Sequence, residues 1–173
     1  MNFSISQAKP EDTPGLVGLL NAVTERLHQR AIHQWNDPWK ADAIEADIVR
    51  NSVFLLWEPE RIIGTYSFKT LESNPWRSKN RSQSLYLYRI ALHPDYQGKA
   101  IGKKLVFHAL AMGRRQRMEV WLDCWAGNEK LKQFYRAAGF LHAGDFPEED
   151  YRISVFYFPL PSSARVPASP KDS

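Results

Sequence analysis

The sequence has little cysteine and no long apolar segment. Its 173 residues include one cysteine, Cys124, which excludes an internal disulfide framework and favours a reducing, cytoplasmic compartment. The longest clear apolar run, residues 53–57, is far shorter than the roughly 18 residues that a membrane-spanning helix needs. The first residues lack the basic start and apolar stretch of a secretory signal. We therefore expect a cytoplasmic protein with no membrane partner.

Metal and cysteine chemistry are also poorly supported. The five histidines show no metal-ligand spacing, so we predict no metal site. No histidine base can be paired with Cys124, which we interpret as a structural thiol.

A composition that is 43% hydrophobic and 24% charged is typical of a globular chain. We predict one domain over residues 1–160, followed by a disordered tail over 161–173 that is rich in proline and serine.

Positive charge is concentrated in one segment. The net charge is +4, and six of the 23 Lys and Arg residues fall between Gln97 and Arg117, where no acidic residue occurs. Such a patch favours a polyanionic partner, namely a phosphate, a nucleotide or a nucleic acid. A solvated basic helix face is the alternative.

Hydrophobic periodicity predicts an α/β domain. Helical spacing marks residues 13–30, 40–51, 102–117 and 128–138, with Thr13 as the first N-cap and Val49 buried. Alternating or short apolar runs mark strands at 3–6, 52–57, 62–68, 85–92, 119–124, 140–142 and 152–158, with loops over 69–83 and 144–151. The order β-α-α-β-β-β-α-β-α-β-β predicts a mixed, largely antiparallel central sheet flanked by helices.

The turn after the strand at 85–92 has the features of an anion site. A strand ends, a short loop containing Gly98 and Gly102 follows, and a helix begins. Free N–H groups and the positive end of the helix dipole favour a bound anion there. The spacing is neither that of a Walker A loop nor GxGxxG.

These residues resemble the Gcn5-related N-acetyltransferase (GNAT) superfamily. The segment QGKAIG, residues 97–102, is similar to the family signature Gln/Arg-x-x-Gly-x-Gly/Ala, with Ala100 in place of the usual first glycine. The preceding IALHPDYQ matches the family's strand end. The later NEKLKQFYRAAGF is similar to the second family signature, with an asparagine, a tyrosine seven residues on and Gly-Phe.

The resemblance implies acetyl-CoA as the acetyl donor. It implies that the pyrophosphate lies on the loop and helix start, and that the pantetheine pairs with a bulged strand as an added strand would. Asn128 matches a position that contacts the cofactor arm. The implied cofactor-binding residues are Ile90, Ala91, Leu92, Gln97, Gly98, Lys99, Ala100, Ile101, Gly102, Lys103 and Asn128.

The resemblance also implies catalytic roles. Tyr135 matches the family tyrosine that protonates the leaving thiolate, although it could instead only fill the core. Asp123 is the candidate base, against a purely structural carboxylate. Backbone N–H groups at Ile90 or Ala91 would stabilise the oxyanion. His33, Glu148, Asp150 and ordered waters are rival bases.

The implied acceptor pocket is formed by residues 33–39 and 145–151. Trp35, Trp39 and the acidic residues at 148–150 suit a cationic primary amine, a small-molecule acceptor. The tryptophans could instead be core anchors and the acids a solvated turn. A protein N-terminus or lysine (a peptide amine) and a non-catalytic acyl-CoA binder stay open. A nucleic-acid partner is disfavoured because the basic cluster coincides with the cofactor loop. The sequence leaves open whether the protein is a monomer or a homodimer.

Overall fold

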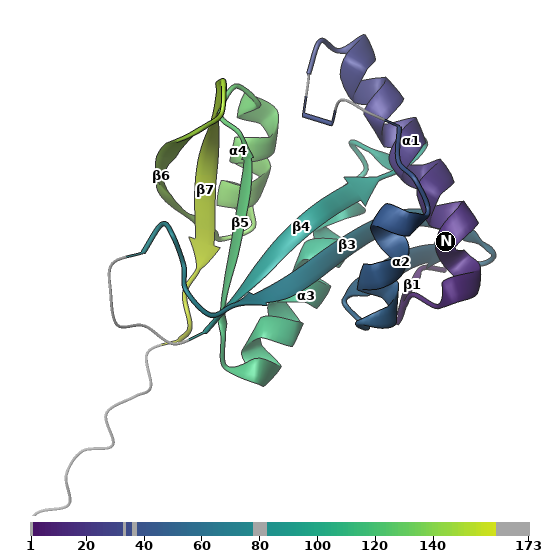
Figure 1. The fold of residues 1–173 in the computed structure, drawn as a ribbon, viewed down its shortest axis with the longest axis horizontal. Helices are drawn as coiled ribbons and strands as arrows, with labels where there is room; N and C mark the ends of the chain where they lie inside the picture. The colour runs from purple at the N-terminus through teal and green to yellow at the C-terminus, as the bar shows by residue number, and fades with distance from the viewer. Residues whose placement is uncertain (1, 33, 36–37, 78–82, 162–173) are drawn as a thin grey trace, which may run out of the picture.

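In the computed structural model, which describes residues 2–32, 34–35, 38–77 and 83–161, seven strands form one sheet with helices on both faces (Figure 1). The strand order is β1-β2-β3-β4-β5-β7-β6, and β4–β5 is the parallel pair among antiparallel neighbours. This confirms the predicted element order and the mixed, largely antiparallel sheet. The elements are β1 (Ser4–Gln7), α1 (Thr13–Gln29), α2 (Asp42–Val49), β2 (Val53–Glu58), β3 (Arg61–Leu71), β4 (Ser84–Leu92), α3 (Gly102–Gln116), β5 (Glu119–Trp125), α4 (Glu129–Ala137), β6 (Leu141–Glu148) and β7 (Tyr151–Phe158), with 3-10 turns at Pro10–Asp12 and Pro94–Tyr96.

The sheet separates two hydrophobic clusters. Helices α1 and α2 pack on one face, where Val53 and Leu55 of β2 belong to their cluster. Helices α3 and α4 pack on the other face, against Phe54 and Leu56. Four consecutive buried residues in β2 are therefore explained by a strand that is covered on both sides. A smaller cluster around Trp121, Ile153 and Val155 lies on the β5–β7 half of the sheet.

Three local predictions are wrong. The loop predicted over 144–151 is mostly strand, because β6 runs to Glu148 and leaves a two-residue turn before β7. Pro147 lies within β6, an edge strand, where the missing N–H of a proline costs little. Val49 is 73% exposed at the end of α2. Thr13 is the first residue of α1 rather than its N-cap, because the turn at Pro10–Asp12 leads directly into the helix.

Two predicted features lie outside the described residues. These are the disordered tail, from residue 162 onward, and His33 as a rival base. The predicted domain boundary at residue 160 stays a prediction.

Helix α3 approaches β5 closely at one glycine. A Cβ at Gly113 would lie 2.4 Å from Cγ2 of Val120 and 3.1 Å from the carbonyl oxygen of Met118. Gly18, inside α1, has no such neighbour within 4 Å of the same built atom. Of these two helix glycines, Gly113 is therefore the one at which a side chain would clash.

We expect Gly113→Ala to lower the free energy of unfolding by about 1–3 kcal/mol, because overpacking outweighs the better helix propensity of alanine. Gly18→Ala, the matched control, should raise it by up to about 1 kcal/mol. Urea denaturation of both variants measures the difference. A Gly113→Ala protein as stable as the wild type would contradict the close packing of α3 on β5.

Candidate active site

The two central strands pair over a short length and then diverge. The parallel register joins Ser84 to Glu119, Leu85 to Val120 and Tyr86 to Trp121. Beyond this point β4 stays paired with β3, and β5 stays paired with β7. Figure 1 shows the two strands separating as a V. The facing edges of β4 and β5 are therefore not paired with each other there, and β4 presents an edge that an extended chain can join.

A bulge interrupts β4 within this divergent part. Thr65 of β3 pairs with Ala91 and Ser67 with Tyr88, so Arg89 and Ile90 together oppose one residue of β3. Arg89 adopts φ +49°. The bulge lies where the sequence places the pantetheine contact and the oxyanion donors, and a bulge leaves backbone groups unpaired.

The loop before α3 offers unpaired backbone donors. Within the described chain, no backbone amide from Gly98 to Lys103 donates a hydrogen bond to another protein group. Lys99 and Lys103 are exposed beside these amides, while Ile101 is buried in the core. The Gln97 side chain donates from Nε2 to the carbonyl oxygen of Leu92 (2.9 Å) and closes the turn. The arrangement suits an anion such as a diphosphate.

Two residues of this loop have left-handed backbone. Gly98 has φ +76° and Ala100 has φ +59°. Alanine therefore occupies a conformation that normally favours glycine. Ala100, at the position of the signature glycine, therefore strains the backbone of the loop.

Tyr135 lies inside the core on α4. Its ring contacts Phe134, Phe140 and Phe156 at centroid distances of 5.5, 5.7 and 5.9 Å. Burial raises the pKa of its phenol strongly, and the nearby Cys124 and Asp123 raise this pKa further. The hydroxyl therefore stays protonated and is available as a proton donor.

Asp123 lies half-buried on β5, within the divergent part of the sheet. Its Oδ2 accepts a hydrogen bond from the hydroxyl of Tyr86. Burial raises the pKa of its carboxyl group, and the charge of Glu148 adds to this, whereas the bond from Tyr86 and the charge of Lys69 lower the same pKa. The balance leaves a carboxylate with increased affinity for a proton, as a general base requires.

The two candidate catalytic groups approach from opposite faces of β5. The neighbours of Asp123, Leu122 and Cys124, belong to the core that contains Tyr135. Asp123 instead bonds to Tyr86, whose ring packs with the smaller cluster on the other face. Asp123 nevertheless lies near enough for its charge to raise the pKa of Tyr135, after burial and Cys124.

Cys124 is an unreactive thiol. Its side chain is buried, and burial raises its pKa to about 12. A thiol with such a pKa supplies almost no thiolate at neutral pH. The interpretation as a structural residue is consistent with this environment.

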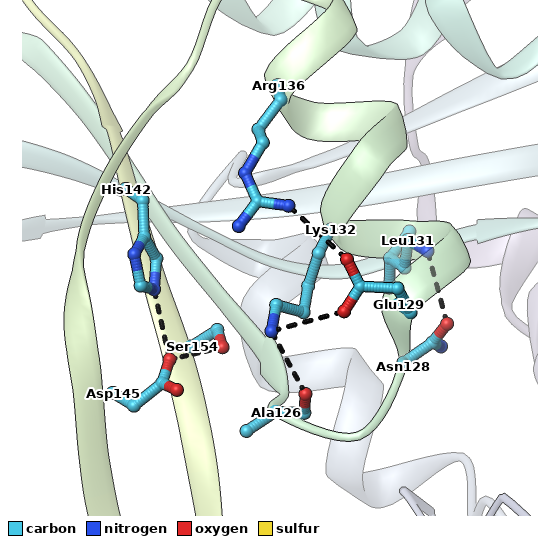
Figure 2. A network of polar contacts seen from close by, with 9 residues as sticks. All are labelled: Ala126, Asn128, Glu129, Leu131, Lys132, Arg136, His142, Asp145 and Ser154. Atoms are coloured by element: carbon cyan, nitrogen blue, oxygen red, sulfur yellow. Dashed lines mark hydrogen bonds and ion pairs between the residues drawn. The ribbon is translucent and has the colours of Figure 1, made fainter.

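Asn128 caps α4. Its Oδ1 accepts a hydrogen bond from the backbone amide of Leu131 (3.1 Å). In Figure 2 the same helix end carries Lys132, whose Nζ donates to the carbonyl oxygen of Ala126 and pairs with Glu129. The opposite side of that view holds His142 and Ser154, both bonded to Asp145. Contact of Asn128 with a cofactor arm stays a prediction.

The segment between α1 and α2 is tied to α1. The backbone amide of Trp39 donates to Oδ1 of Asn21 (2.7 Å), and its Nε1 donates to Thr24 (3.2 Å). Trp35 packs edge-on against Trp39, and the guanidinium of Arg89 lies 5.2 Å from the Trp39 ring. These contacts favour the core-anchor interpretation of the two tryptophans over an open aromatic box.

Sequence reasoning missed Tyr86 and Arg89. The alternation in LYLYR, residues 85–89, places Tyr86 on the face opposite the leucines. This alternation could have identified Tyr86 as a residue of the site. No local pattern shows that Arg89 begins a bulge.

Among the described residues, no group of His, Cys, Asp and Glu could hold a metal ion, and no helix is long and apolar enough to cross a membrane.

We expect Ala100→Gly to raise the free energy of unfolding by about 0.5–1 kcal/mol, because relief of left-handed strain exceeds the entropy that glycine adds to the unfolded chain. Gly98→Ala should lower it by a similar amount. A Cβ there would meet no atom within 4 Å, so this variant isolates the backbone effect. Urea denaturation checks both. A Gly98→Ala protein as stable as the wild type would contradict the left-handed loop.

The comparisons with known proteins agree with this geometry. The model of the acetyltransferase (GNAT) family matches residues 20–140, which span α1 to α4 and include the bulge, the loop, Asp123 and Tyr135. The uncharacterized N-acetyltransferase YesJ of Bacillus subtilis is 25% identical over 150 residues, which cover 82% of this chain and 83% of YesJ.

Two solved structures share the fold. The structure of yncA from Salmonella typhimurium with acetyl-CoA superposes with a TM-score of 0.73 at 19% identity, over 98% of this chain and all of that one. The PaiA N-acetyltransferase of Thermoplasma acidophilum in complex with coenzyme A gives a TM-score of 0.70 at 20% identity, over 91% of this chain and all of PaiA. With a family model that covers most of its length, this chain belongs to the GNAT family and is an acetyl-CoA-dependent N-acetyltransferase.

Proposed function

We propose that the protein transfers the acetyl group of acetyl-CoA to a small cationic primary amine. The observation that carries this choice of acceptor is a group of carboxylates beside the divergence of β4 and β5. Asp123 lies on β5, and Glu148, Glu149 and Asp150 belong to the β6–β7 hairpin. Burial raises the pKa of Tyr151, and the charges of all four carboxylates raise it further. Negative charge gathered near one side chain favours a cation.

The donor side is supported by the unpaired backbone groups. The diphosphate of acetyl-CoA would accept hydrogen bonds from the amides of residues 98–103, with Lys99 and Lys103 beside it. The pantetheine would run along Ile90, Ala91 and Leu92 on the edge that β4 turns toward β5. The yncA and PaiA structures, solved with acetyl-CoA and coenzyme A, support the same ligand here.

The proposed chemistry is direct attack. The neutral amine nitrogen forms a bond to the thioester carbonyl carbon, and the carbon–sulfur bond breaks. Asp123 takes a proton from the amine on one face of β5. Tyr135 gives its hydroxyl proton to the departing sulfur from the other face, and a backbone N–H of Ile90 or Ala91 stabilises the oxyanion.

The polar environment of Asp123 explains how it would reach the amine proton. Aspartate is a short base, but Tyr86 holds its carboxylate by a hydrogen bond and fixes the direction of Oδ2. Glu148 raises the pKa of this carboxyl group, and the same negative charge would attract a cationic group of the acceptor, whose reacting amine is neutral. One hairpin side chain would therefore support both binding and proton transfer.

We expect acetyl-CoA turnover on one class within a panel of polyamines, aminoglycosides, small monoamines and peptide amines, measured as release of free coenzyme A. Tyr135→Phe should reduce kcat on that class by roughly 10²-fold or more, because the phenol is the only acid assigned to the sulfur. Coenzyme A affinity should stay within about twofold, since the loop at 98–103 is untouched. Turnover confined to peptide N-termini or lysine peptides would contradict a small cationic acceptor.

A second prediction concerns pH. The ionised carboxylate of Asp123 is the active form, so kcat/KM should rise with pH through its elevated pKa. Asp123→Asn should lower kcat and remove this limb of the profile. Glu148→Gln should move the limb to lower pH, because it deletes a charge that raises the pKa of Asp123.

The stability of the same variant separates catalysis from folding. Because the folded pKa of Asp123 is raised, ionisation destabilises the fold as pH rises from the unfolded pKa through the folded one. Asp123→Asn should therefore be at least as stable as the wild type at neutral pH in a thermal melt. An unchanged pH profile in Asp123→Asn would assign the base to ordered water instead.

A further inference from the structure

The bulge in β4 directs two consecutive side chains to one face of the sheet. Leu87 and Ile90 pack toward α3 and α4, whereas Ala91 packs toward α1 and α2. Tyr88 and Arg89 both lie on the α1–α2 side, where the guanidinium of Arg89 is 5.2 Å from the Tyr88 ring. The left-handed backbone of Arg89 is what breaks the normal alternation of a strand.

Arg89 is held at several points. Its Nη1 donates to Oδ2 of Asp47 in α2 (2.5 Å), and its Nη2 donates to the carbonyl oxygen of Ala43 (3.2 Å). Its guanidinium also lies 5.2 Å from the ring of Trp39, in the segment that leads into α2. One side chain thus joins the bulge to the helix and to the segment on the acceptor side.

Asp47 is an unusual residue for the helix position that it occupies. It is 8% exposed, so its carboxylate is largely removed from water. Its partner Arg89 is similarly covered, with 18% of its side chain exposed. Such a pair contributes little net stability compared with apolar residues, but loss of one partner leaves a charge without compensation. The second partner of Asp47 is Arg50, whose side chain is 73% exposed and whose Nη1 lies 3.4 Å from Oδ1 of Asp47.

We propose that the Asp47–Arg89 ion pair is a positioning device for catalysis, which fixes the bulge so that the backbone amides after Arg89 face the oxyanion. Left-handed backbone at a bulky residue such as Arg89 is strained, and such strain persists where surrounding contacts hold it, often at functional sites. The pair supplies these contacts from α2, and Trp39 extends them to the acceptor side. The inference rests on the proposed location of the oxyanion at the bulge.

The test compares Asp47→Asn and Arg89→Lys with Arg50→Gln, a control that removes the exposed partner of the same carboxylate. We expect Asp47→Asn to lower kcat about tenfold or more, while the KM for acetyl-CoA and the Kd for coenzyme A change less than about threefold. Arg89→Lys keeps the positive charge but not the contact of both guanidinium nitrogens, so its kcat should fall less than that of Asp47→Asn. Arg50→Gln should match the wild type.

Amide hydrogen exchange gives a readout that needs no acceptor. In Asp47→Asn the amides of Ile90 and Ala91 should exchange about tenfold faster, while Leu85 in the paired part of β4 keeps its wild-type rate. A merely structural role would instead accelerate exchange throughout α2 and β4. Wild-type kcat in Asp47→Asn, or uniform acceleration, overturns the positioning role. Absence of turnover by the wild type on every amine would refute the proposed function, and the exchange result would still decide whether the pair fixes the bulge.

Discussion

The short pairing of β4 with β5 is the constraint on which the rest of the structure depends. Three pairs of residues join the strands at one end, and each strand then follows its outer neighbour, β3 or β7. Because an unpaired strand edge presents N–H and C=O groups, the centre of the sheet becomes a place where an extended ligand can be held. The bulge at Arg89, the turn after β4 and the start of α3 all lie along this one edge.

Burial prepares the two catalytic candidates for opposite tasks. The low-polarity surroundings of Tyr135 raise the pKa of its phenol. The hydroxyl therefore keeps the proton that a general acid must donate. Partial burial of Asp123 raises the pKa of its carboxylate and strengthens the base. Because one group packs with α4 and the other bonds to Tyr86, β5 would separate the two proposed proton transfers. Direct exchange of a proton between the proposed acid and base would thereby be disfavoured.

Prediction from sequence succeeded where the determinants are local. The helix predicted over 128–138 and the loop at 97–102 follow from residues close to each other in the chain. The last hairpin was predicted less well, because Gly144 and Pro147 are breakers in isolation. In the sheet they lie on β6, whose outer edge has no described neighbour to pair with. The edge position, a property of the whole sheet, decides whether such residues interrupt a strand.

The sequence by itself determined the element order and the glycine-containing turn before α3, because these depend on residue spacing and residue chemistry that can be read along the chain. Tyr135 and Asp123 became catalytic candidates through the resemblance of the sequence to the family. Tertiary structure alone decided that Asp123 receives a bond from Tyr86, that Trp39 is covered by Arg89, and that Arg89 finds its partner in Asp47. Each of these contacts joins residues more than 35 positions apart in the sequence. Such contacts follow from strand register and helix packing, so no local sequence pattern predicts them.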